Sequence, residues 1–277
     1  MQQAEYKTIN VWALKVHYAE AGDGPVVVLL HGLADSLLSW YCNIDALADA
    51  GYRVIVPDLP GSGDSDKPDH LEYDPDSAAD LVYDFTQELN VERFSLVGSS
   101  AGGLISGLFA LEHPEMAEKM ALVGSGGFGR RVSWLLRAVS VPVLGNIVYQ
   151  PWVNEKMGIT KRLFHRPPAI LEELLPAMNR MRQLPGARSA VLHGIRSSIT
   201  LRGVRKAGYI MDRPKSFDVP LMTVRGAEDV RRELPGSIVQ VIPECGHWPQ
   251  MEKPSVFNPM LIDFLGGAAA KTAEQES

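Results

Sequence analysis

The feature that most constrains this chain is a G-x-S-x-G motif at residues 98–102, set between two apolar segments. Residues 94–97 predict a short strand, and residues 104–111 predict a helix. A tight strand-to-helix turn requires small residues because the strand and the helix approach closely, and its central side chain projects away from the backbone. That side chain belongs to Ser100, which is therefore placed for nucleophilic attack. Taken alone, the motif is also compatible with a Gly-Ser turn that ends a strand.

Short apolar runs alternate with helical patterns along most of the chain. We expect strands near residues 26–30, 53–56, 94–97, 119–123, 220–225 and 237–242, and helices near residues 36–50, 76–90, 101–113 and 254–265. Asp76 or Ser77 is expected to cap the second helix, and Pro254 to begin the last. Residues 5–20 alternate loosely and turn at residues 21–24, as in an antiparallel hairpin at a sheet edge. This order predicts a doubly wound, mostly parallel α/β sheet.

The pattern changes between residues 130 and 213, where helices are expected at 132–148, 169–182 and 189–206. This segment holds 15 Lys and Arg against 4 Asp and Glu, whereas the remainder holds 12 against 29. Such segregation indicates a separate structural unit that docks on an acidic core or steers an anionic substrate. The core is then expected to comprise residues 1–129 and 214–265, followed by a flexible tail at 266–277.

Composition bounds the class of protein. The 277 residues are 45% hydrophobic and 22% charged with a net charge of −6, as in an ordinary soluble enzyme. There is no apolar run of about 18 residues and no signal-peptide pattern at the start, so we expect cytoplasmic residence without stable membrane insertion. Cys42 and Cys245 are too few for a disulfide framework, and Cys245 is expected to be a packed, inert thiol. Nucleic-acid binding is not expected, because the basic residues form no binding motif and the acidic body would repel phosphate.

Three further motifs follow predicted strands. They read H-G-L-A-D at residues 31–35, D-L-P-G-S-G-D-S at residues 58–65 and C-G-H-W-P at residues 245–249. Together with the serine motif they resemble the α/β-hydrolase superfamily in its chain order of serine, acid and histidine. The resemblance covers about residues 5–265 and implies an α/β-hydrolase fold with a helical cap at residues 130–213 over the catalytic face. All four motifs fall at the carboxyl ends of strands, where open α/β sheets bind their ligands.

The resemblance implies a catalytic triad. Ser100 is the nucleophile and His247 its general base, because a neutral hydroxyl needs a base within hydrogen-bond reach. Asp229 is the orienting carboxylate, with Glu228 as the adjacent fallback. The backbone N–H groups of Leu33 and Ala101 are the expected oxyanion-hole donors. His31 is expected to brace the oxyanion loop, and the remaining histidines to be surface or packing residues.

The expected substrate is a small molecule, a hydrophobic carboxylic ester, cleaved through an acyl-enzyme intermediate. Gly32, Trp248, Leu136 and Val139 are the expected substrate-binding residues, the last two from the apolar stripe at 132–148. Many basic residues lie in the cap, yet no pattern assigns one of its arginines, such as Arg180 or Arg182, to a substrate carboxylate. No metal-ligand cluster and no G-x-G-x-x-G after the first strand is found, so no cofactor and no metal are implied.

Two alternatives stay open. The run G-S-G-G-F-G at residues 124–129 and the G-H-W at residues 246–248 resemble the meta-cleavage-product hydrolases, which cut C–C bonds in vinylogous diketo acids. Against that, residues 31–35 lack the Gly-Pro-Gly extension usual in that group. The second alternative is a hydrolase fold that serves as a non-catalytic binding protein.

The chain departs from the superfamily pattern in one place. Only ten residues, 227–236, separate the acid-bearing strand from the last strand. A parallel crossover normally needs about a dozen residues or more and usually contains a helix. The short connection bears on the placement of Asp229 more than on that of Ser100 or His247. It would also leave sheet surface uncovered, which favours a homo-oligomer.

Overall fold

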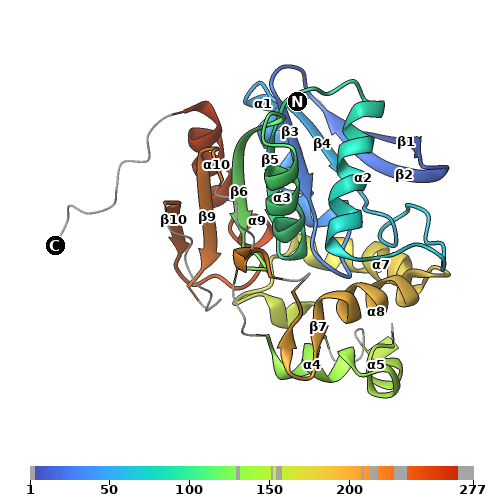
Figure 1. The fold of residues 1–277 in the computed structure, drawn as a ribbon. Coiled ribbons are helices and arrows are strands. Elements are labelled where there is room, and N and C mark those ends of the chain that lie inside the picture. The colour runs from blue at the N-terminus through green and yellow to red at the C-terminus, as the bar shows by residue number, and fades with distance from the viewer. Residues whose placement is uncertain are drawn as a thin grey trace.

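The computed structural model describes residues 4–128, 132–150, 152–153, 158–206, 209–212, 217–227 and 236–267. Its centre is an eight-stranded sheet in the order β1-β2-β4-β3-β5-β6-β9-β10 (Figure 1). The two pairs that involve β2 are antiparallel, and the other five neighbouring pairs are parallel. The predicted doubly wound, mostly parallel α/β fold is confirmed.

The strands of this sheet are β1 (Glu5–Val11), β2 (Leu14–Ala21), β3 (Val26–Leu30), β4 (Arg53–Pro57), β5 (Phe94–Ser99), β6 (Ala117–Val123), β9 (Leu221–Gly226) and β10 (Ile238–Ile242). The helices that accompany it are the 3₁₀ helix η1 (Leu37–Trp40), α1 (Ile44–Asp49), α2 (Pro75–Glu88), α3 (Ala101–Glu112), α9 (Pro249–Glu252) and α10 (Pro254–Gly266).

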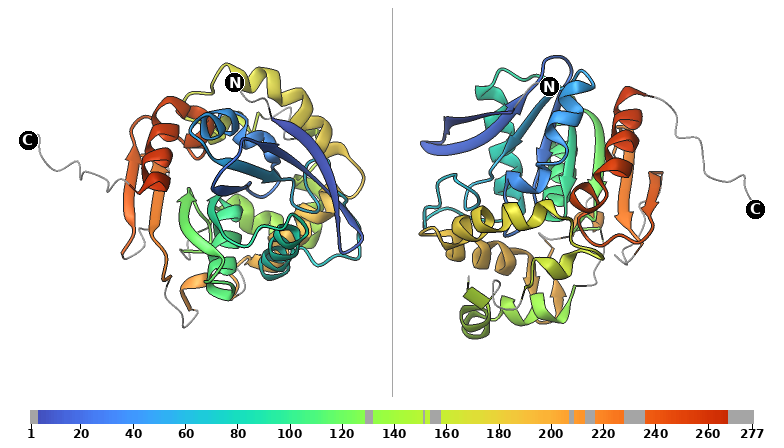
Figure 2. Two further views of the ribbon diagram at one scale, coloured as in Figure 1. Left: turned by 90° about the horizontal axis from the view of Figure 1, so that it is seen from above. Right: turned by 180° about the vertical axis from the view of Figure 1, so that it is seen from behind.

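Helices cover both faces of the sheet (Figure 2). Successive side chains of a strand point to opposite faces, so β3 supplies Val27 and Leu29 to one hydrophobic cluster and Val28 and Leu30 to the other. Helices α1 and α10 pack in the first cluster, and α2 and α3 in the second. Burial on two faces explains why the inner strands are continuous apolar runs instead of alternating ones.

Three local expectations were wrong. The N-terminal hairpin turns at Trp12 and Ala13, both at positive φ, while residues 21–24 connect β2 to β3. The helix expected at 36–50 is divided into η1 and α1. Helix α2 is capped by Asp74, whose carboxylate accepts from the N–H groups of Asp76 and Ser77. Pro254 does begin the last helix.

Residues between β6 and β9 form a helical layer at the carboxyl ends of the parallel strands. Its elements are α4 (Trp134–Ser140), α5 (Pro142–Val148), η2 (Lys161–Leu163), α7 (Ile170–Gln183), α8 (Ala187–Ser198), β7 (Ile199–Thr200), β8 (Gly203–Val204) and η3 (Ile210–Asp212). Helices α7 and α8 lie next to the core, and α4 and α5 lie outermost (Figures 1 and 2). We call this layer the cap.

Two cap boundaries differ from the expected ones. The helix at 132–148 is interrupted because Pro142 lacks an N–H and forces Val141 into an extended conformation, with ψ of 125°. The helix expected at 189–206 ends at Ser198, and the chain continues as the β7–β8 hairpin. At the C-terminus α10 ends on Gly267 in the left-handed conformation, and residues 268–277 of the expected tail lie outside the described residues.

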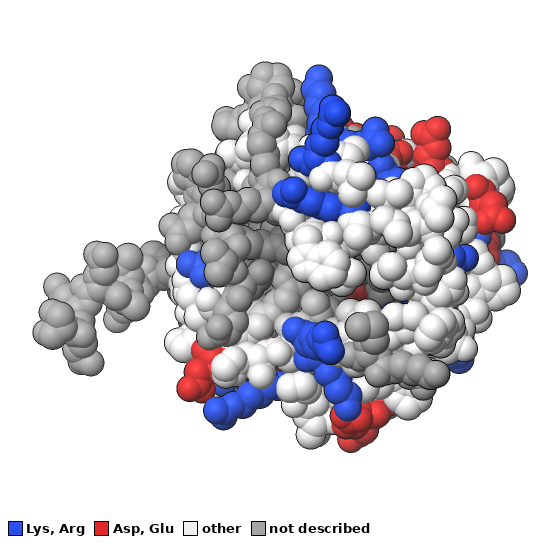
Figure 3. Space-filling model, turned by 90° about the horizontal axis from the view of Figure 1, so that it is seen from below, with Lys and Arg blue, Asp and Glu red and all other residues white. Residues whose placement is uncertain are grey.

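The face seen from below is mostly uncharged where it is described, with Lys and Arg and some Asp and Glu toward its margins (Figure 3). Among the described residues no helix is long and apolar enough to cross a membrane.

Candidate active site

Ser100 lies between β5 and α3 with φ of 54° and ψ of −113°. This is a sparsely populated region for a residue with a Cβ, and such residues persist only where neighbours hold them. Here the Ser100 N–H donates to the Val123 carbonyl at 2.9 Å, and its own carbonyl accepts from the N–H of Gly126 at 2.9 Å. A Cβ on Gly98 or on Gly102 would overlap backbone atoms. The expected sharp turn is therefore present, and its glycines are required sterically.

The segment after β3 lies directly against this turn. A Cβ built on Gly32 would lie 3.1 Å from Ser100 Cβ and 3.7 Å from Ser100 Oγ. Leu33 and Ala101, the expected oxyanion-hole residues, flank the serine from the two sides: Leu33 follows Gly32, and Ala101 is the first residue of α3. Their donor roles stay predictions.

His31 braces this segment as expected. It is buried, and its Nδ1 lies 2.8 Å from the Gly32 carbonyl oxygen while its Nε2 accepts from the Leu59 N–H at 3.0 Å. An imidazole nitrogen that accepts from an amide carries no proton, so the proton is on Nδ1 and the ring is neutral. His31 thus joins the oxyanion segment to the 58–65 loop.

Asp58 organises the 58–65 loop, a role that the sequence motif alone did not reveal. Its fully buried carboxylate accepts from the N–H groups of Leu37 at 2.8 Å and Asp64 at 2.9 Å. His17 Nδ1 lies 2.9 Å from the same carboxylate, and this hydrogen bond raises the pKa of His17. A Cβ on Gly63 would overlap the Asp58 carboxylate, so the loop closes tightly around it.

The loop that carries His247 follows β10 and is fixed by Glu252. One carboxylate oxygen of Glu252 accepts from the Gly246 N–H at 2.8 Å, and the other from the Arg166 N–H at 2.6 Å. The N–H of His165 is a third donor, at 3.2 Å, and the His247 N–H donates to the Leu163 carbonyl at 2.7 Å. Glu252 therefore ties the histidine loop to the cap, which the sequence did not predict.

A second buried connection joins the histidine loop to the serine turn. Gln250 is fully buried, and its Nε2 donates to Ser99 Oγ at 3.2 Å. Asn43 in turn donates to the Gln250 carbonyl at 3.0 Å. Thus the residue before Ser100 is bonded to a residue three positions after His247. No sequence signal identifies this pair, because its members are far apart in the chain.

The carboxylate of the expected triad lies outside the described residues, as does its fallback: these are Asp229 and Glu228. The flanking residues are described. Strand β9 ends at Gly226, the Ala227 N–H donates to the Ile242 carbonyl at 2.9 Å, and β10 pairs parallel to β9 in continuous register. The short connection after β9 therefore begins beside Ile242, the last residue of β10. His247 follows Ile242 a few residues later in the chain.

The expected substrate-binding residues lie in different places. Gly32 is against Ser100, and Trp248 is buried in edge-to-face contact with Phe164 at 5.4 Å between ring centroids. Val139 belongs to a small cap cluster with residues of α8, and Leu136 packs against that cluster. Their contact with substrate stays a prediction.

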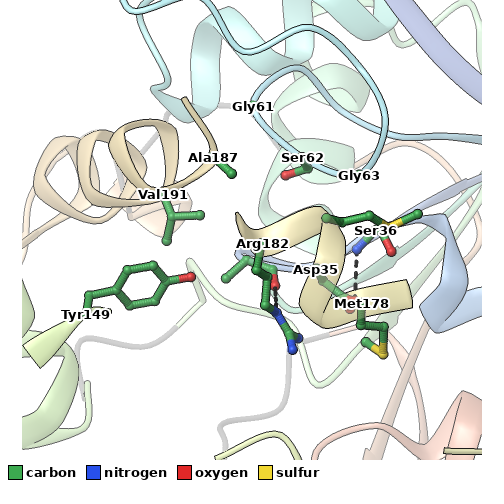
Figure 4. A pocket seen from close by; sticks show the side chains of 12 residues that line it. Asp35, Ser36, Gly61, Ser62, Gly63, Tyr149, Met178, Arg182, Ala187 and Val191 are labelled. Atoms are coloured by element: carbon green, nitrogen blue, oxygen red, sulfur yellow. Dashed lines mark hydrogen bonds between the residues drawn. The ribbon is translucent and has the colours of Figure 1, made fainter. Parts of the chain in front are cut away.

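A pocket of about 330 Å³, which includes space open to solvent, lies between the oxyanion segment, the 61–63 turn and the cap (Figure 4). Neither Leu136 nor Val139 lines it. Its lining residues are Ala34, Asp35, Ser36, Gly61, Ser62, Gly63, Tyr149, Met178, Met181, Arg182, Ala187 and Val191.

The pocket combines an apolar wall with a few polar groups. Burial raises the pKa of Tyr149 to about 12, so its phenol is neutral, and burial also raises the pKa of Asp35. Arg182 is held by hydrogen bonds from Nε to the Ala34 carbonyl at 3.1 Å and from Nη1 to Thr160 Oγ1 at 3.0 Å. An apolar wall with a few polar groups is typical of small-molecule sites, and neither Ser100 nor His247 is among the residues that line this pocket. Within the described ranges no cluster of His, Cys, Asp and Glu has the form of a metal site.

Comparison with known proteins agrees with this geometry. The family model described as "alpha/beta hydrolase fold" matches residues 25–142. A 2-hydroxy-6-oxo-6-phenylhexa-2,4-dienoate hydrolase of Comamonas testosteroni is 33% identical over 90% of this chain and 91% of the relative. A 2-hydroxy-6-oxononadienedioate/2-hydroxy-6-oxononatrienedioate hydrolase of Paraburkholderia phymatum is 31% identical over 96% of this chain and 97% of the relative.

Among solved structures, a single-site mutant of the meta-cleavage product hydrolase CumD superposes with a TM-score of 0.79 at 24% identity, covering 95% of this chain and 98% of that one. At 24% identity this match supports the fold alone. The two relatives above 30% identity extend over nearly the whole chain, so the chain belongs to the α/β-hydrolase superfamily. The resemblance to meta-cleavage-product hydrolases is likewise confirmed.

Proposed function

We propose that this protein hydrolyses a C–C bond in a 2-hydroxy-6-oxo-dienoate, with Ser100 as nucleophile. The observation that carries the proposal is its identity of 33% and 31% with two hydrolases named for such compounds, over 90% and 96% of the chain. The names of these two relatives favour a C–C hydrolase over the ester hydrolase that was expected from the sequence motifs.

The chemistry can be written for the proposed residues. Transfer of the 2-hydroxyl proton to C5 gives a 2-oxo-3-ene, which can accept the electron pair of the C5–C6 bond. Ser100 Oγ then adds to the C6 carbonyl while His247 takes its proton, and the N–H groups of Leu33 and Ala101 stabilise the oxyanion. Collapse breaks C5–C6 and leaves an acyl-Ser100 and a dienolate, whose oxygen is protonated at the expense of the His247 imidazolium, so that His247 is again a neutral base. Water, deprotonated by His247, releases the acid.

Arg182 is our candidate for binding the dienoate carboxylate. It borders the pocket and its guanidinium is anchored at the oxyanion segment through Ala34. The neighbouring Arg180 is less suited, because its Nη2 already pairs with Asp64 at 2.7 Å. A guanidinium is well matched to a carboxylate because it donates two parallel hydrogen bonds.

Carboxylic ester hydrolysis is the second candidate function. The observation that favours it is the short 31–35 segment without the Gly-Pro-Gly extension. The same serine, histidine and oxyanion donors would serve both reactions, since each proceeds through a tetrahedral intermediate and an acyl-enzyme. Cytoplasmic residence and self-association stay predictions.

Parallel kinetics would decide between the two reactions. The purified protein is assayed with 2-hydroxy-6-oxo-6-phenylhexa-2,4-dienoate, by loss of the dienolate absorbance, and with p-nitrophenyl butyrate. We expect kcat/KM to be about a hundredfold or more higher for the dienoate, as for a site that recognises polar substrate groups. A higher kcat/KM for p-nitrophenyl butyrate would instead identify the protein as an ester hydrolase.

Two controls accompany this assay. The S100A variant should lose about four orders of magnitude in kcat with either substrate while keeping its circular dichroism spectrum. A fluorophosphonate probe should label the parent protein and not S100A. Absence of labelling and of both activities would instead favour the non-catalytic binding protein.

A further inference from the structure

Helices α4 and α5 present an apolar surface to solvent. The exposed fractions are 79% for Trp134, 69% for Val143, 46% for Leu144 and 65% for Ile147. Single exposed apolar residues are ordinary on protein surfaces, whereas a contiguous group indicates an interaction site. We call these four residues, with Leu135, the outer cap face.

The orientation of α5 is the reverse of that of an ordinary surface helix. Val143, Leu144 and Ile147 lie on one side at helical spacing and point outward. The opposite side is attached to α8 through Val148, which packs against the small cap cluster, and through two arginines: Arg196 Nη2 donates to the Pro142 carbonyl at 3.1 Å, and Arg188 Nε to the Tyr149 carbonyl at 2.9 Å. Arginines thus hold the backbone of α5 so that its apolar side faces away from the protein.

The two chain segments that form and border the outer cap face carry one sign of charge. The elements next to it lie within residues 132–150 and 187–206, which contain six Lys and Arg and no Asp or Glu. Helix α4 contacts β7, and the β7–β8 turn carries exposed Leu201 beside exposed Arg202. Figure 3 views this side and shows an uncharged area with basic residues close to it, and with both basic and acidic residues farther out at its margins.

We propose that the outer cap face docks on an anionic membrane surface, with the apolar side chains at the acyl boundary and the surrounding cations on lipid headgroups. Apolar side chains with an exposed tryptophan and a basic border are the features of interfacial binding. Each cation near an anionic bilayer adds to the attraction. The α4 and α5 helices have seven residues each, so the contact is peripheral.

Charge also argues against a second copy of this chain as the occupant. Two outer cap faces in contact would bring twelve cations together without a carboxylate from these elements to pair with them. The rest of the chain has 29 acidic against 12 basic residues outside 130–213, so an anionic surface repels the body and attracts the cap. The molecule would therefore approach the membrane cap first.

Vesicle flotation tests this proposal with the full-length protein. The vesicles contain phosphatidylcholine alone or phosphatidylcholine with phosphatidylglycerol. We expect about tenfold or stronger binding to the anionic vesicles at low salt, and its loss near 1 M salt, where the Debye length falls to about 3 Å. Equal binding to both vesicles, or no binding to either, would overturn the proposal.

Paired variants identify the surface. The V143S/I147S double variant should bind anionic vesicles about tenfold more weakly, because less apolar area is inserted. V256S is its control, since Val256 is 45% exposed on α10 of the core. R202Q/R205Q should weaken binding and its salt dependence, whereas R93Q, at an exposed core position, should not.

Thermal unfolding should be unchanged in all four variants, because each changed side chain is exposed. Two further results would overturn the proposal. One is full membrane binding by V143S/I147S. The other is a dimer in light scattering that the same substitutions dissociate, which would make a second copy the occupant.

Discussion

At the scale of single residues, the position of Ser100 is set by its backbone. Its φ of 54° and ψ of −113° cost about 1–3 kcal/mol in a residue with a Cβ, and interactions of the surrounding turn must offset this free energy. Hydrogen bonds to Val123 and Gly126 do so from two directions. The serine therefore depends on strand β6 and its following loop as much as on its own motif.

Glu252 is a positioning residue for the histidine loop, and its replacement should affect catalysis. In E252Q one carboxylate oxygen becomes an NH₂ group, so either the N–H groups of Gly246 and His165, which share one oxygen, or the N–H of Arg166, which uses the other, lose their acceptor. A buried amide left unsatisfied costs about 1–3 kcal/mol. We expect kcat to fall about tenfold or more with little change in KM, because the loop of His247 shifts and the pocket does not.

The matched control is E172Q. Glu172 is an exposed carboxylate on α7, paired with Lys161 at 2.6 Å, and its loss should change neither constant. Urea unfolding of both variants separates positioning from stability. If E252Q lost stability but kept its kcat under folding conditions, Glu252 would be a purely structural residue.

At the scale of elements, the 58–65 loop links the sheet edge to the active site through Asp58. Its partner His17 lies on β2, and the hydrogen bond to Asp58 raises the pKa of His17 in the folded protein. A raised folded pKa means that the stabilisation is complete below the unfolded value of about 6.5 and is lost as pH rises through the folded value. We therefore expect lower stability at alkaline than at mildly acidic pH from this pair.

Urea unfolding over this pH range measures the effect. H17Q should remove about 1 kcal/mol of the pH-dependent stability, a modest amount because the His17 side chain is partly exposed and the pair is partly screened by solvent. H70Q is the control, since His70 is exposed and outside the loop network. A pH dependence in H17Q identical to that of the parent would exclude the His17–Asp58 pair as its source.

Elements whose signals are local could be predicted from the sequence, and those fixed by tertiary contacts could not. The buried strands, the serine turn and the start at Pro254 follow from apolar runs, glycines and proline. The residue that caps the N-terminus of α2 was predicted two or three positions too late, because several neighbouring side chains could serve. The contacts Gln250–Ser99 and Glu252–Arg166 join residues 151 and 86 apart, so no local pattern marks them.

At the scale of the whole molecule, two of the contacts that join the cap to the core are made by arginines of α7. Arg180 pairs with Asp64 of the 58–65 loop, and Arg182 donates to Ala34 of the oxyanion segment. The surplus of cations in the cap thus meets carboxylates and carbonyls of the acidic core. On the far side, residues 132–150 and 187–206 contain six Lys and Arg and no Asp or Glu, so this part of the cap keeps a positive charge for the proposed membrane contact.

The whole sheet also determines whether the triad is complete, because its members follow different strands. Ser100 follows β5, and His247 follows β10, which pairs with β9. If Asp229, just after β9, orients His247, D229N should lower kcat about 10⁴-fold by leaving the imidazole in the wrong tautomer. Steady-state kinetics on the better substrate measures this.

The short 227–236 connection makes the other outcomes informative. A D229N variant with unchanged kcat, together with a large loss of kcat in E228Q, would mean that Glu228 is the orienting carboxylate, because the two positions are adjacent in the sequence. Neutrality of both variants would mean that a serine–histidine pair works without a carboxylate to stabilise the imidazolium, and the parent kcat should then already be low. We expect D229N to lose most of its kcat, because β9 and β10 keep continuous parallel register up to Gly226 and Ile242. The loops that follow these two strands therefore begin side by side.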